Sequence, residues 1–278
     1  MSYPTPNELF DVSGKVVVIT GGAGVLCGEI ARFLGAHGAH VVVADIDISR
    51  AKQVADEINE ADQGTGAVVE ANVLSRESVK AACTCVVGNF GKIDILINGA
   101  GGNRKEATTA PDRPFFDLDA DVVRSVFDLN CIGAILPSQV FGKQMAERNE
   151  GIILNVGSMC GFRPLTNVVG YSAAKAAVAN FTQWLAVHMA QNYSPNIRVN
   201  AIAPGFFLTQ QNRFLLTDEK TGELTARGRQ IIDHTPAGRF GEPADLLGTV
   251  LWLISDAAGF LTGTIVPIDG GFSAYSGV

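Results

Sequence analysis

Short runs of β-branched apolar residues recur along the chain, separated by longer stretches of different periodicity. Runs rich in Val and Ile are typical of strands that are buried on both faces of a sheet. They predict seven strands: KVVVIT at 15–20, HVVVAD at 40–45, GAVVEANV at 66–73, IDILING at 93–99, GIILNVGS at 151–158, NIRVNAIAP at 196–204 and GTIVPIDGG at 263–271.

The stretches between these runs carry apolar residues at every third or fourth position, which predicts amphipathic helices. Examples are GEIARFLGAHG, SRAKQVADEINEA and SRESVKAACTCVVGNF. Strands that alternate with helices must be parallel, with right-handed crossovers and helices on both faces. We therefore expect an α/β doubly wound Rossmann fold, with residues 1–278 as a single domain and ligands at the carboxyl ends of the strands.

One segment, 206–236, interrupts the alternation with polar turns and helix fragments between the sixth and seventh predicted strands. Long excursions from a compact domain are commonly functional or disordered. The Phe and Leu content of this segment favours a lid over a substrate site.

Composition and charge narrow the class of partner. The chain has 278 residues, of which 47% are hydrophobic and 18% charged, with a formal net charge of -7. A negative balance argues against a nucleic-acid or anionic-membrane surface and favours small-molecule chemistry. The opening MSYPTPNELFDVSGK has no cationic segment followed by an apolar run, so we expect a cytoplasmic protein.

Cysteine and histidine usage gives no indication of a metal. The five cysteines form an odd set without CxxC spacing, which suits free thiols in a reducing compartment. The four histidines are scattered without ligand spacing, so no metal is expected.

A glycine-rich turn, TGGAGVLCG at 20–28, follows the first predicted strand directly and opens the first helix. Backbone N–H groups at such a helix start face an anion favourably, and glycine lets the backbone approach a pyrophosphate. Taken alone, the turn is also compatible with a simple tight connection.

Two further strand ends carry candidate cofactor residues. Asp45 ends the second predicted strand, where a carboxylate accepts hydrogen bonds from ribose hydroxyls and repels a 2′-phosphate, which favours NAD over NADP. The alternative is a solvated aspartate that opens a turn. NGAGG at 98–102 ends the fourth strand, and its small residues would let a planar cofactor pass close to the backbone.

Candidate catalytic residues occur in a fixed order. Tyr171 and Lys175 are four positions apart and so share one helix face, and Ser158 precedes Tyr171 by thirteen positions. Together with the glycine turn, Asn130 in FDLNCIG, Asn98–Gly101 and Pro204–Gly205, this ordered set resembles the short-chain dehydrogenase/reductase family over essentially the whole chain.

The resemblance implies a nicotinamide-dependent oxidoreductase acting on CH–OH groups. Tyr171 would be the general acid for carbonyl reduction and the general base for alcohol oxidation. Lys175 would bring the pKa of the phenol toward the working pH and reach the nicotinamide ribose. Ser158 would hydrogen-bond the substrate oxygen, and Asn130 would support a proton-relay water at a helix kink.

The resemblance also implies which residues form the cofactor site. We expect NAD to be bound by Gly21, Gly24, Val25, Leu26, Asp45, Asn72, Val73, Asn98, Gly99, Ala100, Gly101, Tyr171, Lys175, Pro204, Gly205 and Thr209. The common family turn is TGxxxGxG, whereas Val25 and Cys27 stand at its second and third glycines, so Gly24 would replace a glycine only after a local shift. Asn72 stands where many members carry an aspartate that contacts adenine.

A narrower resemblance concerns the substrate. INGAGGNRKEATT, FRPLTNVVGYSAAK and NAIAPGFFLTQQNRFLLT resemble bacterial D-mannonate oxidoreductases (fructuronate reductases) of the short-chain type, which interconvert D-fructuronate and D-mannonate. Arginine suits bidentate recognition of a sugar-acid carboxylate. The expected substrate residues are Arg104, Ser158, Arg163, Tyr171, Asn212 and Arg213. For Arg104 and Arg213, a solvated surface charge is an equal alternative.

Other functions stay open at this point. Another polyol or keto-sugar-acid reductase, such as a gluconate 5-dehydrogenase, or a 3-ketoacyl reductase has the same catalytic residues. A catalytically silent dinucleotide-binding protein is a different class, although such proteins often lose the tyrosine or the lysine. The family resemblance further implies a homotetramer.

Overall fold

The computed structural model of the chain describes residues 3–61, 63–209, 216–218 and 221–277. Its centre is one sheet of seven parallel strands in the order β3-β2-β1-β4-β5-β6-β7, so the predicted strands and the doubly wound α/β fold are confirmed. The strands are β1 Val16–Thr20, β2 His40–Asp45, β3 Thr65–Glu70, β4 Ile95–Asn98, β5 Gly151–Val156, β6 Ile197–Pro204 and β7 Ile265–Ile268.

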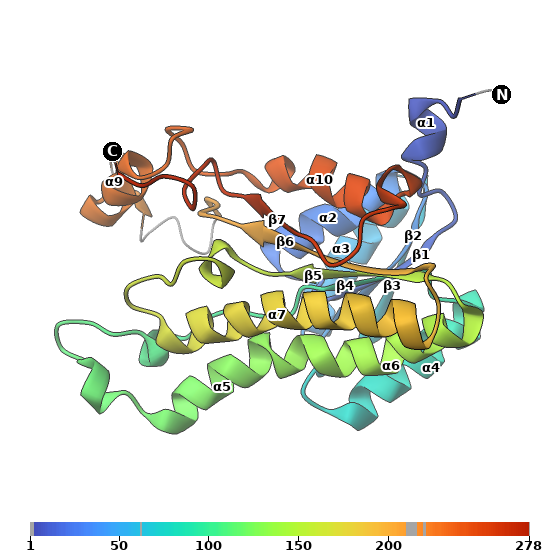
Figure 1. Ribbon diagram of the computed structural model, residues 1–278, viewed down its shortest axis with the longest axis horizontal. Helices are drawn as coiled ribbons and strands as arrows, with labels where there is room; N and C mark the ends of the chain where they lie inside the picture. Colours follow the sequence, from blue (N-terminus) through green and yellow to red (C-terminus); the bar gives the residue numbers. More distant parts are fainter. Residues whose placement is uncertain (1–2, 62, 210–215, 219–220, 278) are drawn as a thin grey trace.

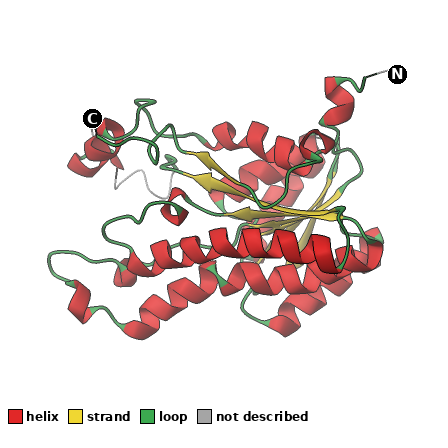
Figure 2. Cartoon of the chain, in the orientation of Figure 1, coloured by secondary structure: helices red, strands yellow, loops and turns green. Residues whose placement is uncertain are grey.

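Helices cover both faces of the sheet, with α2, α3 and α10 on one side and α4, α5, α6 and α7 on the other (Figures 1 and 2). The α-helices are α1 Pro6–Leu9, α2 Val25–Ala36, α3 Ile48–Glu60, α4 Arg76–Phe90, α5 Ala120–Asn130, α6 Ile132–Arg148, α7 Val169–Asn192, α9 Ala226–Asp233 and α10 Leu247–Ile254. Short 3₁₀ segments are η1 Lys105–Ala107, η2 Phe115–Asp117, η3 Met159–Gly161, η4 Pro243–Leu246 and η5 Asp256–Ala258.

The strands read as continuous apolar runs because each face of the sheet has its own core. Val17 and Ile19 of β1 belong to the cluster that includes the inner residues of α2, α3 and α10. Val16 and Val18 belong to the opposite cluster, which includes the inner residues of α4, α6 and α7. Alternate side chains therefore leave the sheet in opposite directions, and neither set meets water.

Several predicted runs are longer than the observed strands at their carboxyl ends. GAVVEANV was expected to reach residue 73, yet β3 ends at Glu70, and the run to 271 ends as β7 at Ile268. The surplus residues have left the sheet to form loops, since Asn, Asp and Gly favour turns over strands.

The chain runs outward from β1 to β3 and then returns to place β4 on the other side of β1. Such a reversal separates the loops after β1 and β4 and opens a crevice at the carboxyl edge of the sheet. Those loops, the arm between β4 and α5, and α9 gather at the left of Figure 1. No helix within the described ranges combines the length and apolar character needed to cross a membrane.

Candidate active site

A cleft of about 600 Å³ opens at the carboxyl edge of the sheet. It is bounded by the ends of β1, β2, β4, β5 and β6 and by the first turns of α7. Its lining contains these expected residues: Gly21, Gly24, Val25, Leu26, Asp45, Gly99, Ala100, Gly101, Ser158, Tyr171, Lys175, Pro204, Gly205 and Thr209. The fold therefore brings most of the expected cofactor residues to one cavity with three of the four expected catalytic residues.

The glycine turn forms one wall of this cleft. Gly21 has φ +64°, and a Cβ on it would lie 2.7 Å from the Cα of Ala100, so only glycine fits there. Gly24 is the N-cap of α2 and offers no side chain to the N–H groups that follow it. The first-turn N–H groups of α2 thus lack a capping side chain, which is the arrangement that accepts an anion.

Asp45 lies at the end of β2 and is held by the backbone around it. Its Oδ2 accepts a hydrogen bond from the N–H of Ala23 at 3.0 Å, and its Oδ1 accepts one from the N–H of Asp47 at 3.0 Å. Arg50, which sequence reasoning did not select, also lines this end of the cleft. The carboxylate is therefore fixed beside the glycine turn.

Asn72 and Val73 are not among the residues that line the cleft. Asn72 is exposed, and its Oδ1 accepts the N–H of Leu74 at 3.0 Å, which shapes the turn before α4. Val73 is buried, and a Cβ on Gly133 of α6 would lie 3.0 Å from its Cγ2.

Asn98 points into the protein interior and not into the cleft. It is 3% exposed, and its Nδ2 donates to the Oγ of Ser138 at 2.9 Å and to the Oδ1 of Asn155 at 2.8 Å. Asn155 in turn donates to the Oγ1 of Thr182 at 2.9 Å. This buried chain of hydrogen bonds joins β4 and β5 to α6 and α7 beneath the site.

Three side chains converge on the other wall. Tyr171 and Lys175 come from the start of α7, and Ser158 follows β5. The Tyr171 hydroxyl is hydrogen-bonded to the Ser158 side chain, whose Oγ also accepts the N–H of Cys160 at 3.2 Å. The Nζ of Lys175 lies 5.6 Å from the centroid of the Tyr171 ring and donates to the carbonyl of Val156 at 2.8 Å.

Burial controls the ionisation of Tyr171 and Lys175. Burial raises the pKa of Tyr171 to about 12, with a smaller contribution in the same direction from Cys160 and an opposing one from the Ser158 hydrogen bond. Burial also lowers the pKa of Lys175 to about 8. Burial dominates the shift of Tyr171, and the expectation that Lys175 brings the pKa of the phenol toward the working pH stays a prediction.

Asn130 is the last residue of α5 and is 1% exposed. Its Oδ1 accepts the N–H of Gly102 at 3.1 Å, and its Nδ2 donates to the Gly102 carbonyl at 2.7 Å and to the Val126 carbonyl at 2.8 Å. The side chain therefore fixes Gly102, which lines the cleft, at the break between α5 and α6.

The expected substrate residues are less well gathered. Arg104 and Arg163 are exposed, and neither is among the residues that line the cleft. Arg104 precedes η1, and Arg163 follows η3 with its N–H donating to the Met159 carbonyl at 3.1 Å. Asn212 and Arg213 lie outside the described residues.

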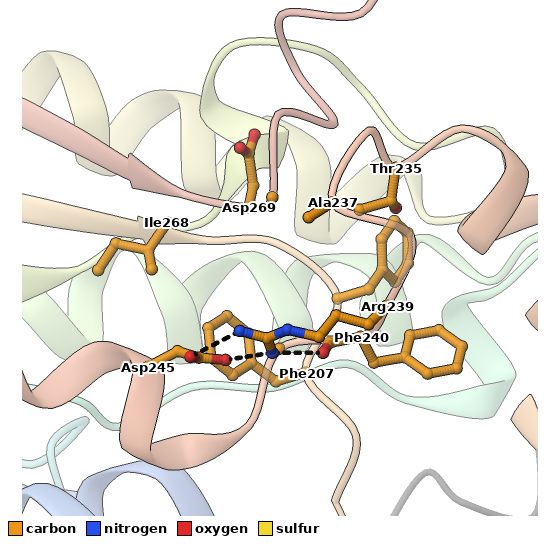
Figure 3. Close-up of a pocket in the computed structure, with 11 residues that line it drawn as sticks. Phe207, Thr235, Ala237, Arg239, Phe240, Asp245, Ile268 and Asp269 are labelled. Atoms are coloured by element: carbon orange, nitrogen blue, oxygen red, sulfur yellow. Dashed lines mark hydrogen bonds and ion pairs between the residues drawn. The ribbon is translucent and has the colours of Figure 1, made fainter.

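A second hollow of about 240 Å³ adjoins the cleft, because Phe206 and Phe207 line both (Figure 3). Arg239 makes a bidentate pair with Asp245, with N–O distances of 2.6 and 2.9 Å. The backbone of Gly241 pairs with that of Phe206 and Leu208. Sequence reasoning missed this wall because it joins residues 206–208 to residues 239–245, which are far apart in the chain. The local signal was the arginine six positions before an aspartate in RFGEPAD.

No group of three or more His, Cys, Asp or Glu side chains within the described part of the chain is arranged to hold a metal ion. The cleft described above is lined by the phenol of Tyr171, the ammonium of Lys175 and the hydroxyl of Ser158.

Comparisons with known proteins agree with this geometry. The family model described as Enoyl-(Acyl carrier protein) reductase matches residues 24–273. An uncharacterized oxidoreductase of Bacillus subtilis is 47% identical over 96% of this chain and 98% of its own. The 5-keto-D-gluconate 5-reductase of Escherichia coli is 32% identical over 95% of this chain and 98% of its own.

A solved structure is similar over nearly the full length. It is of a Haemophilus influenzae protein provisionally named a D-mannonate oxidoreductase, with bound NAD, and has a TM-score of 0.89 and 43% identity over 96% of this chain and 98% of that one. With its parallel sheet, glycine turn and Ser158–Tyr171–Lys175 cluster, this chain belongs to the short-chain dehydrogenase/reductase family of oxidoreductases, which act on alcohol and ketone groups.

Proposed function

We propose that the protein is an NAD(H)-dependent oxidoreductase that interconverts D-fructuronate and D-mannonate. The observation that carries the proposal is the convergence of Tyr171, Ser158 and Lys175 on a cleft whose opposite wall is a glycine turn followed by an uncapped helix start. The sugar-acid part is supported by relatives named for D-mannonate and 5-keto-D-gluconate.

The cleft fits a dinucleotide. The uncapped N–H groups at the start of α2 suit a pyrophosphate, and the small residues Gly99–Gly101 leave room beside the backbone for a flat ring. Asp45 would accept hydrogen bonds from the ribose hydroxyls and disfavour a 2′-phosphate. NAD, when bound, supplies or accepts the hydride.

Tyr171 would supply the proton that the reduced carbonyl oxygen needs. Its raised pKa keeps the phenol protonated at neutral pH, which is the form required of a general acid. Ser158 Oγ accepts the N–H of Cys160, and the serine hydroxyl proton would turn from Tyr171 to the substrate oxygen. Ser158 would therefore donate to the substrate oxygen as negative charge develops on it.

Lys175 and Asn130 would act beside the reacting atoms. A Cβ on Gly101 would lie 3.4 Å from the Nζ of Lys175, so the ammonium borders the segment proposed to face the nicotinamide ribose. Asn130 would hold Gly102 in place and support a proton-relay water at the break between α5 and α6.

The substrate carboxylate needs a cationic partner, for which we propose Arg104, Arg163 and Arg213, with Asn212 binding a hydroxyl. The arm that carries Arg104 and the loop that carries Arg163 are joined, since the N–H of Thr109 donates to the Asn167 carbonyl at 2.9 Å. The two exposed arginines therefore lie on segments that are hydrogen-bonded to each other.

We also propose a cytoplasmic homotetramer. All five cysteines are free, which suits a reducing compartment. On α7, Trp184 and Val187 are each 56% exposed, and a hollow of about 380 Å³ with mainly apolar walls lies between α6 and α7. Exposed apolar surface of this kind favours contact between subunits.

The test is oxidation of NADH with D-fructuronate, beside 5-keto-D-gluconate, fructose and an acetoacetyl thioester. Selective turnover of D-fructuronate supports the proposal. Selective turnover of 5-keto-D-gluconate would establish the second candidate, which the E. coli relative favours. Lack of turnover with every ketone would leave a dinucleotide-binding protein.

A further inference from the structure

The glycine turn and the segment after β4 touch at a pair of residues of unusual relative size. Cys27 lies in the first turn of α2, is 5% exposed and lines the cleft. A Cβ built on Gly99 would lie 2.2 Å from the Sγ of Cys27 and 2.8 Å from the carbonyl oxygen of Thr20. The sulfur therefore occupies the space that any side chain at position 99 would need.

Gly99 is required for space and not for backbone conformation. Its φ is outside the positive range, unlike that of Gly21 at +64°. Its N–H donates to the Thr20 carbonyl at 3.1 Å, so the backbone here is tied to the end of β1. A larger residue at position 99 would have to displace the sulfur, the backbone of β1 or the loop after β4.

The thiol acts as a packing group. Burial raises the pKa of Cys27 to about 12, so the side chain is neutral at any physiological pH. In the TGxxxGxG turn common in the family, this position is a glycine. In this chain the larger residue, Cys27, lies on the glycine turn, and the smaller residue, Gly99, lies on the segment that faces it.

We propose that Cys27 and Gly99 form one packing unit that sets the separation between the glycine turn and the segment after β4. Cys27 is then a positioning residue for NAD, and this rests on the proposed function. The two segments would hold opposite parts of the dinucleotide, the pyrophosphate and the nicotinamide end. A change in their separation would alter NAD binding more than binding of the ketone.

The experiment is a double-mutant cycle of Cys27→Gly, Gly99→Ala and the double variant, with NAD affinity measured by calorimetry and KM for the ketone measured beside it. Gly99→Ala is expected to weaken NAD binding by about tenfold or more, because the new methyl meets the sulfur and the Thr20 carbonyl. The double variant should bind NAD more tightly than Gly99→Ala, since the conflict with the sulfur is removed and only the 2.8 Å approach to the backbone carbonyl of Thr20 is left. Double-variant affinity equal to the product of the two single effects would overturn the proposal.

A matched control separates positioning from general destabilisation. Cys83 is buried in α4 against the opposite face of the sheet, so Cys83→Gly removes a similar side chain far from the cleft. It should lower the melting temperature as Cys27→Gly does but leave NAD affinity and KM for the ketone unchanged. NAD affinity of Cys27→Gly equal to that of Cys83→Gly would count against a positioning role.

Melting temperatures without NAD keep the test independent of the proposed function. The double variant should melt above Gly99→Ala, or be recovered folded where Gly99→Ala is not. A double variant that melts below Gly99→Ala would refute the packing unit. If wild type itself fails to bind NAD, the proposed function and the positioning role fall, while the melting data still decide whether the two residues are coupled.

Discussion

Replacing Tyr171 with phenylalanine removes one hydroxyl and little else. The ring keeps its place on α7 beside Lys175, whose Nζ lies 5.6 Å from the ring centroid. The hydroxyl is hydrogen-bonded to Ser158, so the variant loses that bond. Loss of one such bond costs about 1 kcal/mol of folding free energy, which a domain of this size tolerates.

The effect on turnover should be far larger. A positioned general acid contributes about 10²–10⁴-fold to a rate, equivalent to about 3–5 kcal/mol in the activation barrier. We therefore expect kcat for ketone reduction to fall by about two to four orders of magnitude, with NAD affinity changed by less than about twofold.

The assay combines steady-state NADH oxidation with calorimetric titration of NAD and a thermal melt. Tyr193→Phe is the control, because Tyr193 follows the other end of α7 and is 54% exposed. The reasoning is refuted if Tyr171→Phe keeps kcat within about threefold of wild type. Loss of NAD affinity as large as the loss of kcat would instead show that the hydroxyl has a structural role.

Three further predictions concern Asp45, Lys175 and Arg163. Asp45→Ala should raise the NADP-to-NAD ratio of kcat/KM by about tenfold or more, because the carboxylate no longer repels a 2′-phosphate, and an unchanged ratio would reject this. The folded-state pKa of Lys175, about 8, lies below its ordinary 10.5, so wild type should gain stability relative to Lys175→Met as pH rises from 8 toward 10 in thermal melts. A pH-independent difference in melting temperature would contradict it. Arg163→Ala should raise KM for D-fructuronate by about tenfold and leave KM for a neutral ketose unchanged. The exposed control variant Arg124→Ala should change neither KM. Equal increases in KM for both substrates would remove Arg163 from carboxylate binding.

The sheet was predictable because burial on both faces leaves a strong local pattern. Each of the seven apolar runs became a strand, and their alternation with helices dictated the parallel arrangement. The carboxyl edge of such a sheet gathers the loops, so the meeting of the glycine turn with Ser158 and Tyr171 followed from chain order.

The direction of individual side chains was not predictable in the same way. Asn98 pairs in register with Asn155 across β4 and β5, which places two amides side by side in the interior instead of in the cleft. Asn72 uses its side chain on its own turn at Leu74. The Asn98 contact depends on which strand lies beside β4, and local sequence does not encode that. The Asn72 bond is a local turn that the sequence permits but does not distinguish from a role in cofactor binding.

The pKa of Tyr171 was likewise not predictable from the sequence. Spacing of four residues placed Lys175 near the phenol, as expected on one helix face. Burial was not visible in the spacing, and it raises the pKa of one group while lowering that of the other. Proximity was therefore predictable, whereas the dielectric environment that governs its effect required the fold.

The ionisation of Tyr171 and Lys175 bears on the rate of the reaction in each direction. With the pKa of Tyr171 near 12, the phenol is protonated at neutral pH, and reduction of a ketone needs that form. Oxidation of an alcohol needs the phenolate, which burial opposes and which a charged Lys175 would favour. The pKa of Lys175 is about 8, so raising the pH to form phenolate also removes the ammonium that would stabilise it. Burial alone thus holds Tyr171 in the protonated form that ketone reduction uses, and the phenolate that alcohol oxidation uses would require further positive charge beside it.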